Sequence, residues 1–132
     1  MKEGNRMNIK KLGDAELEIM EVLWDSSEPL TSGYILEKIR PTRKWALSTL
    51  MATLARLTDK GFVYCDRSTR TNYYTAVITA EEYRASEGTS FIRKLYGGSV
   101  KRLVASLYDC RELDAKDIAE LRAFLDELER KE

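Results

Sequence analysis

The sequence predicts a mainly α-helical chain with one small β-hairpin, and three observations lead to this fold class. Apolar residues recur with helical spacing between Arg43 and Lys60. Two runs rich in β-forming residues, 62–65 and 73–78, follow that helix. From Thr79 onward every apolar pattern is helical. We therefore expect a helical domain completed by a hairpin over residues 1–78 and helices alone over residues 79–132.

The first helix is expected over residues 14–24, where apolar side chains recur at helical spacing. Gly13 or Asp14 would be its N-cap, and the carboxylate of Glu16 would reach back to the backbone of Gly13. The residues assigned to its apolar face are Leu17, Ile19, Met20, Leu23 and Trp24. Residues 1–11 are mostly polar apart from Ile9, and we expect them to be mobile.

A second, short helix follows the turn at residues 25–29. Thr31 or Ser32 is expected to cap it, because a hydroxyl oxygen can accept a hydrogen bond from an amide of the first turn. Pro41 should end it, since proline disfavours helical backbone in the residue before it. The side chains assigned to the inner face of this helix are Tyr34, Ile35, Leu36 and Ile39.

The third helix has a clear apolar stripe and an unusual opposite face. The stripe is predicted from the i, i+3, i+4, i+7 spacing of Leu47, Leu50, Met51, Leu54 and Leu57. Short side chains dominate the opposite face, which carries Trp45, Ser48, Thr49, Ala52, Thr53 and Arg56. Such a face lets another surface approach the backbone closely. Gly61 is expected to end the helix, because glycine tolerates the left-handed conformation.

The hairpin that follows has a polar loop, residues 66–72, with arginines at positions 67 and 70. Two short helices and a third with a small outer face form a helix-turn-helix arrangement, to which a hairpin adds a wing. In that geometry the outer face of the third helix enters the major groove of DNA. Phosphates would then be contacted by Arg43, Lys44, Arg56, Arg67 and Arg70. The alternative is a solvated helix face beside a wing whose charges only keep an edge strand soluble.

Charge is distributed unevenly along the chain. The 22 basic and 22 acidic residues cancel, so bulk attraction to nucleic acid or to a membrane surface is not expected. Between residues 40 and 75, however, seven basic residues face two acidic ones, which gives a local charge of +5. Residues 79–132 carry a charge of −2. Because local positive charge is what contacts phosphate, this partition favours DNA binding by the first domain.

The two cysteines, Cys65 and Cys110, form no CxxC motif, and the chain contains no histidine. A zinc or copper site built from this chain alone is therefore not expected, and we assign no cofactor. Both thiols are interpreted as small apolar core residues in a reducing compartment. No apolar run approaches the roughly 20 residues that span a bilayer, so we expect a cytoplasmic protein without membrane insertion.

The C-terminal helices are expected to begin at Thr79, Ser99 and Asp114, each a residue type that caps helix N-termini. Glu82 completes a capping box with Thr79, and Gly97-Gly98 separates the first two helices. The apolar residues assigned to dimerisation are Leu103, Leu107, Ile118, Leu121, Phe124, Leu125 and Leu128. Because short, one-sided helices need a packing partner, we expect a second copy of the chain to cover these residues. The alternative is that they fold back on the winged helix of the same chain.

An ordered set of segments runs through nearly the whole chain. It comprises Ala15-Glu16-Leu17-Glu18-Ile19-Met20 with Trp24; Ser48-Thr49-Leu50-Met51 with Leu54, Arg56 and Leu57; Lys60-Gly61-Phe62-Val63; Phe91 with Leu95-Tyr96-Gly97-Gly98; and Glu120-Leu121-Arg122. This set resembles the penicillinase repressors and their relatives, which include the methicillin-resistance and copper-responsive repressors. The resemblance implies a winged helix, C-terminal dimerisation helices, and repression by a homodimer on a palindromic double-stranded DNA operator.

The resemblance also implies that Ser48 and Thr49 touch bases. Family repressors paired with a membrane β-lactam sensor are inactivated by proteolysis in the helix after the Gly-Gly pair. The corresponding bond here joins Ser106 and Leu107, where well-known members have Asn-Phe, so cleavage by a sensor-protease system stays open. Copper-responsive members carry CxC ligands near the C-terminus, and this chain ends without them, which disfavours copper sensing.

Two other classes of function compete with a repressor. A winged-helix protein-interaction module without specific DNA binding is the alternative, and the basic cluster between Arg40 and Arg70 argues against it. An enzyme is not expected, because the chain has no histidine, no glycine-rich phosphate loop and no nucleophile–base pair at a recognisable spacing.

Overall fold

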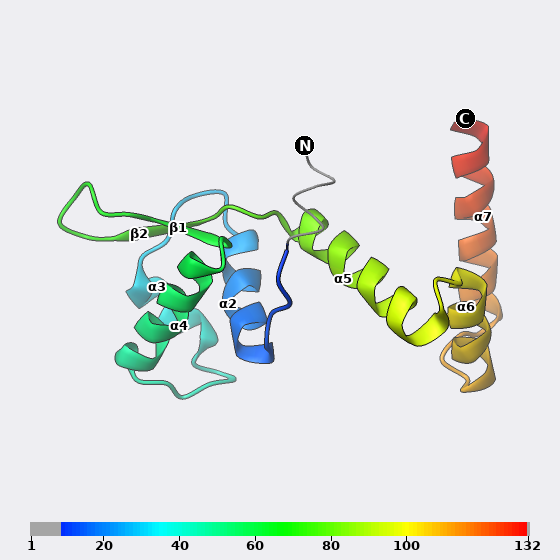
Figure 1. Cartoon of the computed structure of the whole chain (residues 1–132), viewed down its shortest axis with the longest axis horizontal. Coiled ribbons are helices and arrows are strands. Elements are labelled where there is room, and N and C mark those ends of the chain that lie inside the picture. Colours follow the sequence, from blue (N-terminus) through cyan, green and yellow to red (C-terminus); the bar gives the residue numbers. More distant parts are fainter. Residues whose placement is uncertain (1–8, 132) are drawn as a thin grey trace. The chain divides into compact units, whose positions relative to one another are not determined.

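A computed structural model describes residues 9–131 and shows helices with one two-stranded antiparallel sheet. The elements follow in the order α2 (Asp14–Trp24), α3 (Ser32–Ile39), α4 (Leu47–Asp59), β1 (Val63–Asp66), β2 (Tyr73–Ala76), α5 (Ala80–Tyr96), α6 (Val100–Asp109) and α7 (Ala115–Lys131) (Figure 1). The predicted fold class is confirmed. The expected mobility of the N-terminal segment falls mainly on residues 1–8, which lie outside the described residues.

The chain divides into two compact units between Glu87 and Gly88. The first unit includes the start of α5, because Tyr83 is buried there and its hydroxyl accepts a 2.9 Å hydrogen bond from the backbone N–H of Leu12. The second unit contains the rest of α5 with α6 and α7. The sequence predicts a DNA-binding domain over residues 1–78 and a dimerisation region over residues 79–132, and this assignment of functions stays a prediction.

Three helices and the base of the hairpin share the core of the first unit. The buried apolar residues of these helices are Ile19, Met20, Leu23, Ile35, Leu36, Ile39, Leu50, Leu54 and Leu57. Phe62, before β1, is fully buried and meets the ring of Tyr83 edge-on at 5.7 Å between centroids. Tyr34 was expected inside but is exposed, because the inward stripe of α3 is centred on Ile35 and Ile39, about 100° away from it.

Most helix ends lie at the expected capping residues, but α4 begins only at Leu47, after the Trp45 that was assigned to its outer face. The N–H of Gly13 donates a 2.9 Å hydrogen bond to Glu16 Oε1, which is the half of a capping box that glycine permits. Thr79 and Glu82 form the full reciprocal pair at 2.9 and 3.0 Å. Gly61 takes φ of +86° after α4, as predicted for a left-handed helix stop. Side-chain caps also form at Thr31, Ser99 and Asp114.

The hairpin pairs β1 and β2 antiparallel, with Val63 opposite Ala76 and Asp66 opposite Tyr73. Its strands are within two residues of the predicted runs. Leu30 forms an additional bridge to Tyr74, with N···O distances of 2.9 and 2.7 Å in the two directions. The segment before α3 therefore anchors the hairpin to the helices.

The buried face of α4 differs from the predicted one. Leu47 and Met51, assigned to the buried stripe, are 49% and 37% exposed. Thr53, assigned to the outer face, is only 1% exposed. The observed inward stripe is Leu50, Thr53, Leu54 and Leu57, which has the same spacing in a different phase. Thr53 tolerates burial because its hydroxyl donates a 2.9 Å hydrogen bond to the carbonyl of Thr49.

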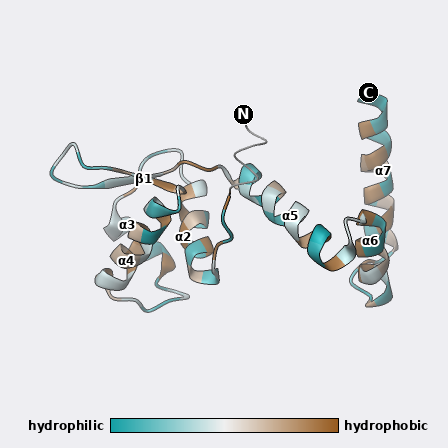
Figure 2. Cartoon of the chain, in the orientation of Figure 1, coloured by the Kyte–Doolittle hydropathy of each residue, from teal (hydrophilic) through white to brown (hydrophobic). Residues whose placement is uncertain are grey.

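The second unit buries no side chain between Gly88 and Lys131. Its helices are separated as expected at Gly97 and Gly98, which have φ of +58° and +84°. Apolar and polar stretches alternate along α7 (Figure 2). Over residues 9–131, no helix has the length and apolar character that crossing a bilayer requires.

Candidate nucleic-acid interface

The outer face of α4 is a surface of short side chains. Ser48, Thr49 and Ala52 are exposed there, as predicted from the sequence. At 100° per residue the exposed arc begins at Leu47 and Met51, continues through Ser48 and Ala52, and ends near Thr49. Such a face presents backbone and small polar groups to an approaching surface.

The first turn of α4 has no side-chain cap. Its N-cap residue is Ala46, whose carbonyl accepts from the N–H groups of Thr49 and Leu50 but whose methyl side chain offers no acceptor to the amides before them. The first amides of a helix have no intrahelical partner, and the helix dipole concentrates positive charge at this end. The N-terminus of α4 therefore suits a negatively charged group.

Arg43, predicted to contact phosphate, is held by α2. Its Nε and Nη2 atoms each lie 2.9 Å from Glu18 Oε2, and the Thr42 hydroxyl donates to Glu18 Oε1 at 2.8 Å. The hydrogen bonds from Arg43, followed by that from Thr42, hold the pKa of Glu18 below its ordinary value. Arg43 thus fastens the segment before α4 to α2, and its contact with phosphate stays a prediction.

Trp45 does not lie on the helix face to which it was assigned. It precedes the N-cap Ala46, is half-buried, and packs against the core of the first unit. The guanidinium of Arg43 lies over its ring, 5.7 Å from the centroid. Lys44, between these two residues, is exposed, and its contact with phosphate stays a prediction.

At the other end of α4, Glu16 of α2 organises two cations. Lys60 Nζ lies 2.8 and 2.9 Å from its two carboxylate oxygens, and Arg56 Nε lies 3.8 Å from Oε2. Burial raises the pKa of Glu16, but the hydrogen bonds from Lys60 and the Gly13 N–H outweigh it, so the net pKa is lowered. The Arg56 side chain remains 60% exposed, and its contact with DNA stays a prediction.

The predicted wing arginines, Arg67 and Arg70, are exposed in the loop between the strands. Asp66 Oδ1 accepts a 2.9 Å hydrogen bond from the N–H of Ser68, which orders the start of this loop. A groove of about 200 Å³ separates α4 from the hairpin. It is lined by Met51, Ala55, Thr58, Asp59, Cys65, Arg67, Asn72 and Tyr74.

Thr53, like Trp45, is a predicted DNA-contacting residue that does not lie on the exposed face of α4. The Thr53 side chain is buried on the inner face of α4 and therefore cannot contact a base edge. Sequence reasoning in turn missed Leu47 and Met51, which lie on the exposed face. A threonine in a leucine stripe was the available signal, because threonine can satisfy its hydroxyl within its own helix.

The two cysteines differ from the expected core position to different degrees: Cys65 packs against the core from its edge, and Cys110 lies outside it. Cys65 is only half-buried in β1, and Cys110 is exposed at the C-terminal end of α6. Within residues 9–131, no cluster of three or more His, Cys, Asp or Glu side chains has a geometry that could hold a metal ion.

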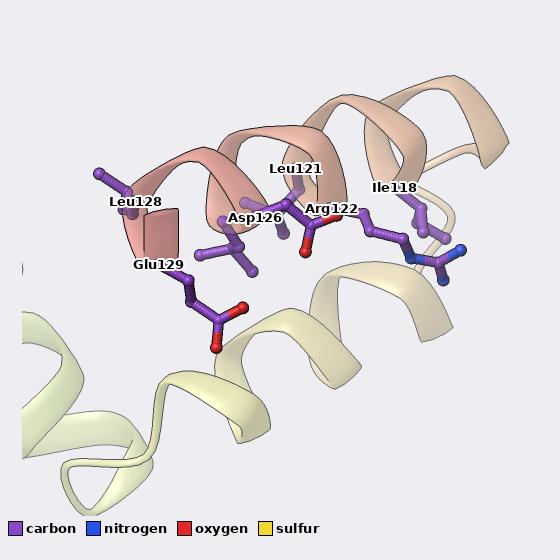
Figure 3. A pocket seen from close by; sticks show the side chains of 7 residues that line it. Ile118, Leu121, Arg122, Asp126, Leu128 and Glu129 are labelled. Atoms are coloured by element: carbon purple, nitrogen blue, oxygen red, sulfur yellow. The ribbon is translucent and has the colours of Figure 1, made fainter. Parts of the chain in front are cut away.

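The predicted dimerisation residues lie on the second unit. Phe124, Leu125 and Leu128 of α7 are 55%, 49% and 42% exposed, and Leu121 is 37% exposed. Ile118 and the two α6 residues, Leu103 and Leu107, are half-buried. A groove of about 580 Å³ runs along α7, and its lining alternates leucine with the charged residues Arg122, Asp126 and Glu129. Figure 3 shows the lining side chains on α7, with α6 beside this helix.

Known proteins match the chain over a range that includes both α4 and most of α7. The family model described as penicillinase repressor matches residues 12–127. The chain is 29% identical over 119 residues to the penicillinase repressor of Bacillus licheniformis, covering 90% of this chain and 92% of that protein. It is 30% identical over 121 residues to the transcriptional regulator BlaI of Mycobacterium tuberculosis, covering 92% of this chain and 87% of that protein.

A solved structure is also similar to the first unit. The solution structure of the DNA-binding domain of the repressor BlaI matches with a TM-score of 0.50 and 31% sequence identity. The match covers 57% of this chain and 90% of that chain. The fold of the first unit is therefore similar to that of a domain that binds DNA.

Proposed function

The chain belongs to the penicillinase repressor family, and we propose that it represses transcription as a homodimer bound to a palindromic operator. The chain is a DNA-binding transcriptional repressor and not an enzyme. The observation that carries the proposal is the exposed face of α4, whose small side chains lie between exposed cations at Lys44 and Arg56. Because a repressor must reach its operator, we place the protein in the cytoplasm.

In the proposed complex, α4 enters the major groove. Ser48, Thr49 and Ala52 face the base edges, since they occupy the middle and one edge of its exposed arc. Lys44 before α4 and Arg56 in its last turn contact phosphates from the helix side, while Arg67 and Arg70 reach phosphates from the wing. The uncapped first turn of α4 adds a favourable site for a phosphate near Ala46. Affinity then comes largely from phosphates, and sequence preference comes from the helix.

The second unit supplies the proposed dimer interface. With no buried side chain between Gly88 and Lys131, the helical hairpin of α6 and α7 lacks a core of its own. Pairing with a second copy across a two-fold axis covers the same stripe on both chains. A two-fold dimer presents two α4 helices to half-sites roughly 34 Å apart, or a multiple of that distance, which is why the operator should be an inverted repeat.

We propose that proteolysis relieves repression, and that a membrane sensor-protease system supplies the protease. The bond between Ser106 and Leu107 lies inside α6, and the Ser106 Oγ lies 3.4 Å from the hydroxyl of Tyr96. A cut there would separate α7 from the first unit and weaken the dimer. Since proteases bind extended chain, α6 has to unwind first. Mass spectrometry of the protein recovered from induced cells would detect the two fragments.

The test of the proposed function is selection of bound duplexes from a random pool with the full-length protein at two salt concentrations. We expect enrichment of an inverted repeat whose binding weakens steeply as salt rises. A folded protein that enriches no sequence would contradict the proposal and would favour the protein-interaction module.

A further inference from the structure

Two apolar side chains lie on a part of α4 where a soluble helix usually carries polar ones. Leu47 and Met51 are 49% and 37% exposed. They are four residues apart, so they neighbour each other on the helix surface. Ser48 and Ala52 lie directly beside them on the same exposed arc. The four residues therefore form one continuous surface in the N-terminal half of α4, which we name the apolar edge.

The first unit covers this edge only in part. Met51 lines the groove between α4 and the hairpin, and its sulfur lies 4.0 Å from the hydroxyl of Tyr74. Leu47 is the first residue of the helix and is about half exposed. Leaving such side chains in water forgoes the hydrophobic free energy of their burial, about 25 cal/mol for each Å² of apolar surface.

We infer that Leu47 and Met51 contact the 5-methyl groups of thymines in the operator, and this inference rests on the proposed function. Each base pair shows a pattern of donors and acceptors in the major groove, and the thymine methyl is the one apolar group among them. An apolar side chain at that position favours thymine over cytosine, which lacks the methyl group. Methionine suits this contact because its unbranched, polarisable side chain adapts to the surface it meets.

The charge around the apolar edge favours DNA as the occupant over another protein surface. Residues 40–75 carry a net charge of +5, and exposed cations lie at Lys44 and Arg67. A polyanion with apolar groups on its base edges matches both features. Ser48 and Ala52, which the proposed function assigns to bases, belong to the apolar edge, so Leu47 and Met51 lie directly beside the base-facing residues.

The experiment replaces each thymidine of the selected duplex by deoxyuridine, one at a time, and measures binding of the full-length protein. The exchange removes one methyl group and leaves base pairing unchanged. We expect at least one position in each half-site where affinity falls about fourfold. This factor corresponds to about 0.8 kcal/mol, the hydrophobic free energy of burying one methylene-sized group. Leu47→Ala or Met51→Ala should lose this discrimination at its own position and bind both duplexes equally.

Val77→Ala is the matched control, because Val77 is an exposed apolar residue that lies off α4. This variant should keep the fourfold preference. Both test positions are exposed, so their variants should remain folded by circular dichroism.

Several results would overturn the inference. Wild-type protein could bind all deoxyuridine duplexes equally, the selected operator could contain no thymine, or both alanine variants could retain the preference. A variant that changed the sedimentation coefficient and not the preference would show the apolar edge to be a protein interface. Failure to select any duplex would instead refute the proposed function, and this inference with it.

Discussion

Lys60 Nζ lies 2.8 and 2.9 Å from the two carboxylate oxygens of Glu16, so the C-terminal end of α4 is tied to the first turn of α2. Glu18, two residues further along α2, binds Arg43 just before α4 begins. Two neighbouring carboxylates thus fix both ends of the helix whose outer face we assign to DNA. This arrangement uses a charged pair for positioning, and it leaves the exposed arc of α4 free.

Glu16→Gln should destabilise the first unit. The Glu16 side chain is 8% exposed, and its loss of charge weakens the hydrogen bonds to Lys60 and leaves that ammonium without its carboxylate. Hydrogen bonds to charged groups contribute about 1.5–3 kcal/mol, so we expect the free energy of unfolding to fall by about 2 kcal/mol. Urea denaturation measures it.

Glu21→Gln is the matched control for that substitution. Glu21 lies on the same helix, 3.9 Å from Arg84, but both side chains are more than half exposed. Exposed ion pairs contribute little, so this change should cost less than about 0.5 kcal/mol. Equal losses in the two variants would contradict a positioning role for Glu16.

Acid should destabilise the protein through the same two carboxylates. The pKa values of Glu16 and Glu18 are lowered from the ordinary 4.5 in the folded chain. The unfolded chain therefore binds protons more readily, and the stabilisation is complete well above pH 4.5 and is lost as the pH falls through the folded pKa values. Unfolding free energies measured across this window should fall less steeply for a Glu16→Gln/Glu18→Gln variant. Parallel curves would contradict the assignment.

Local chemistry could be predicted from the sequence because its partners are close along the chain. The pairs Gly13 with Glu16 and Thr79 with Glu82 are each three residues apart, so a helix start places them in contact. The stop at Gly61 depends on one residue's backbone freedom. None of these features needs knowledge of how the helices pack.

The phase of α4 could not be predicted in this way. Both the predicted and the observed stripes contain Leu50, Leu54 and Leu57. The predicted stripe adds Leu47 and Met51 on one side, whereas the observed stripe adds Thr53 on the other. Packing against α3 and β1 makes that choice, and it buries Thr53 while exposing Met51. The ion pair between Glu16 and Lys60 joins residues 44 positions apart, so helical periodicity contains no signal for it.

Arg67→Ala and Arg70→Ala should weaken binding to all duplexes similarly. Each arginine is exposed in the wing, where the proposed complex places it on a phosphate. Losing one phosphate contact reduces the magnitude of the slope of log K against log salt by about 0.9.

Thr49→Ala should instead relax base preference, by about 1–3 kcal/mol if its contact is direct. Binding titrations at several salt concentrations separate these effects.

Lys116→Ala provides the control for the salt experiment. Lys116 is exposed on α7, in the second unit, and should leave the slope unchanged. A change of sequence preference in Arg67→Ala with an unaltered salt slope would refute the division of roles between helix and wing.

Arg111→Gly should stabilise the protein. Arg111 has φ of +69° after α6, where the N–H of Glu112 bonds to the carbonyl of Leu107 at 2.9 Å and closes a Schellman motif. A side chain at that φ is strained by roughly 1 kcal/mol, and glycine relieves it. The midpoint of thermal unfolding at fixed protein concentration should rise.

Gly61→Ala tests the same principle in reverse. Gly61 occupies the equivalent position after α4 with φ of +86°, and no atom lies within 4 Å of an added Cβ. The loss should therefore come from backbone strain alone, again about 1 kcal/mol. If both substitutions changed stability in the same direction, the strain at Arg111 would not be the cause.

Leu121→Glu and Leu125→Glu should convert the proposed dimer to monomers. Both leucines line the groove on α7. A carboxylate at either position would lose its hydration when a second copy packs against it, and an unpaired buried charge is strongly unfavourable. Sedimentation velocity should show the monomer. Operator affinity should fall far more than affinity for random duplex, because only specific binding uses both half-sites.

The control for this experiment is Ala123→Glu, which adds the same charge to the opposite face of α7. Ala123 is exposed, and at 100° per residue it lies roughly 160° from Leu125. It should remain dimeric and bind the operator like the wild type. If Leu125→Glu also stayed dimeric, the stripe on α7 would not be the interface, and the two α4 helices would have to be joined through another surface to read an inverted repeat.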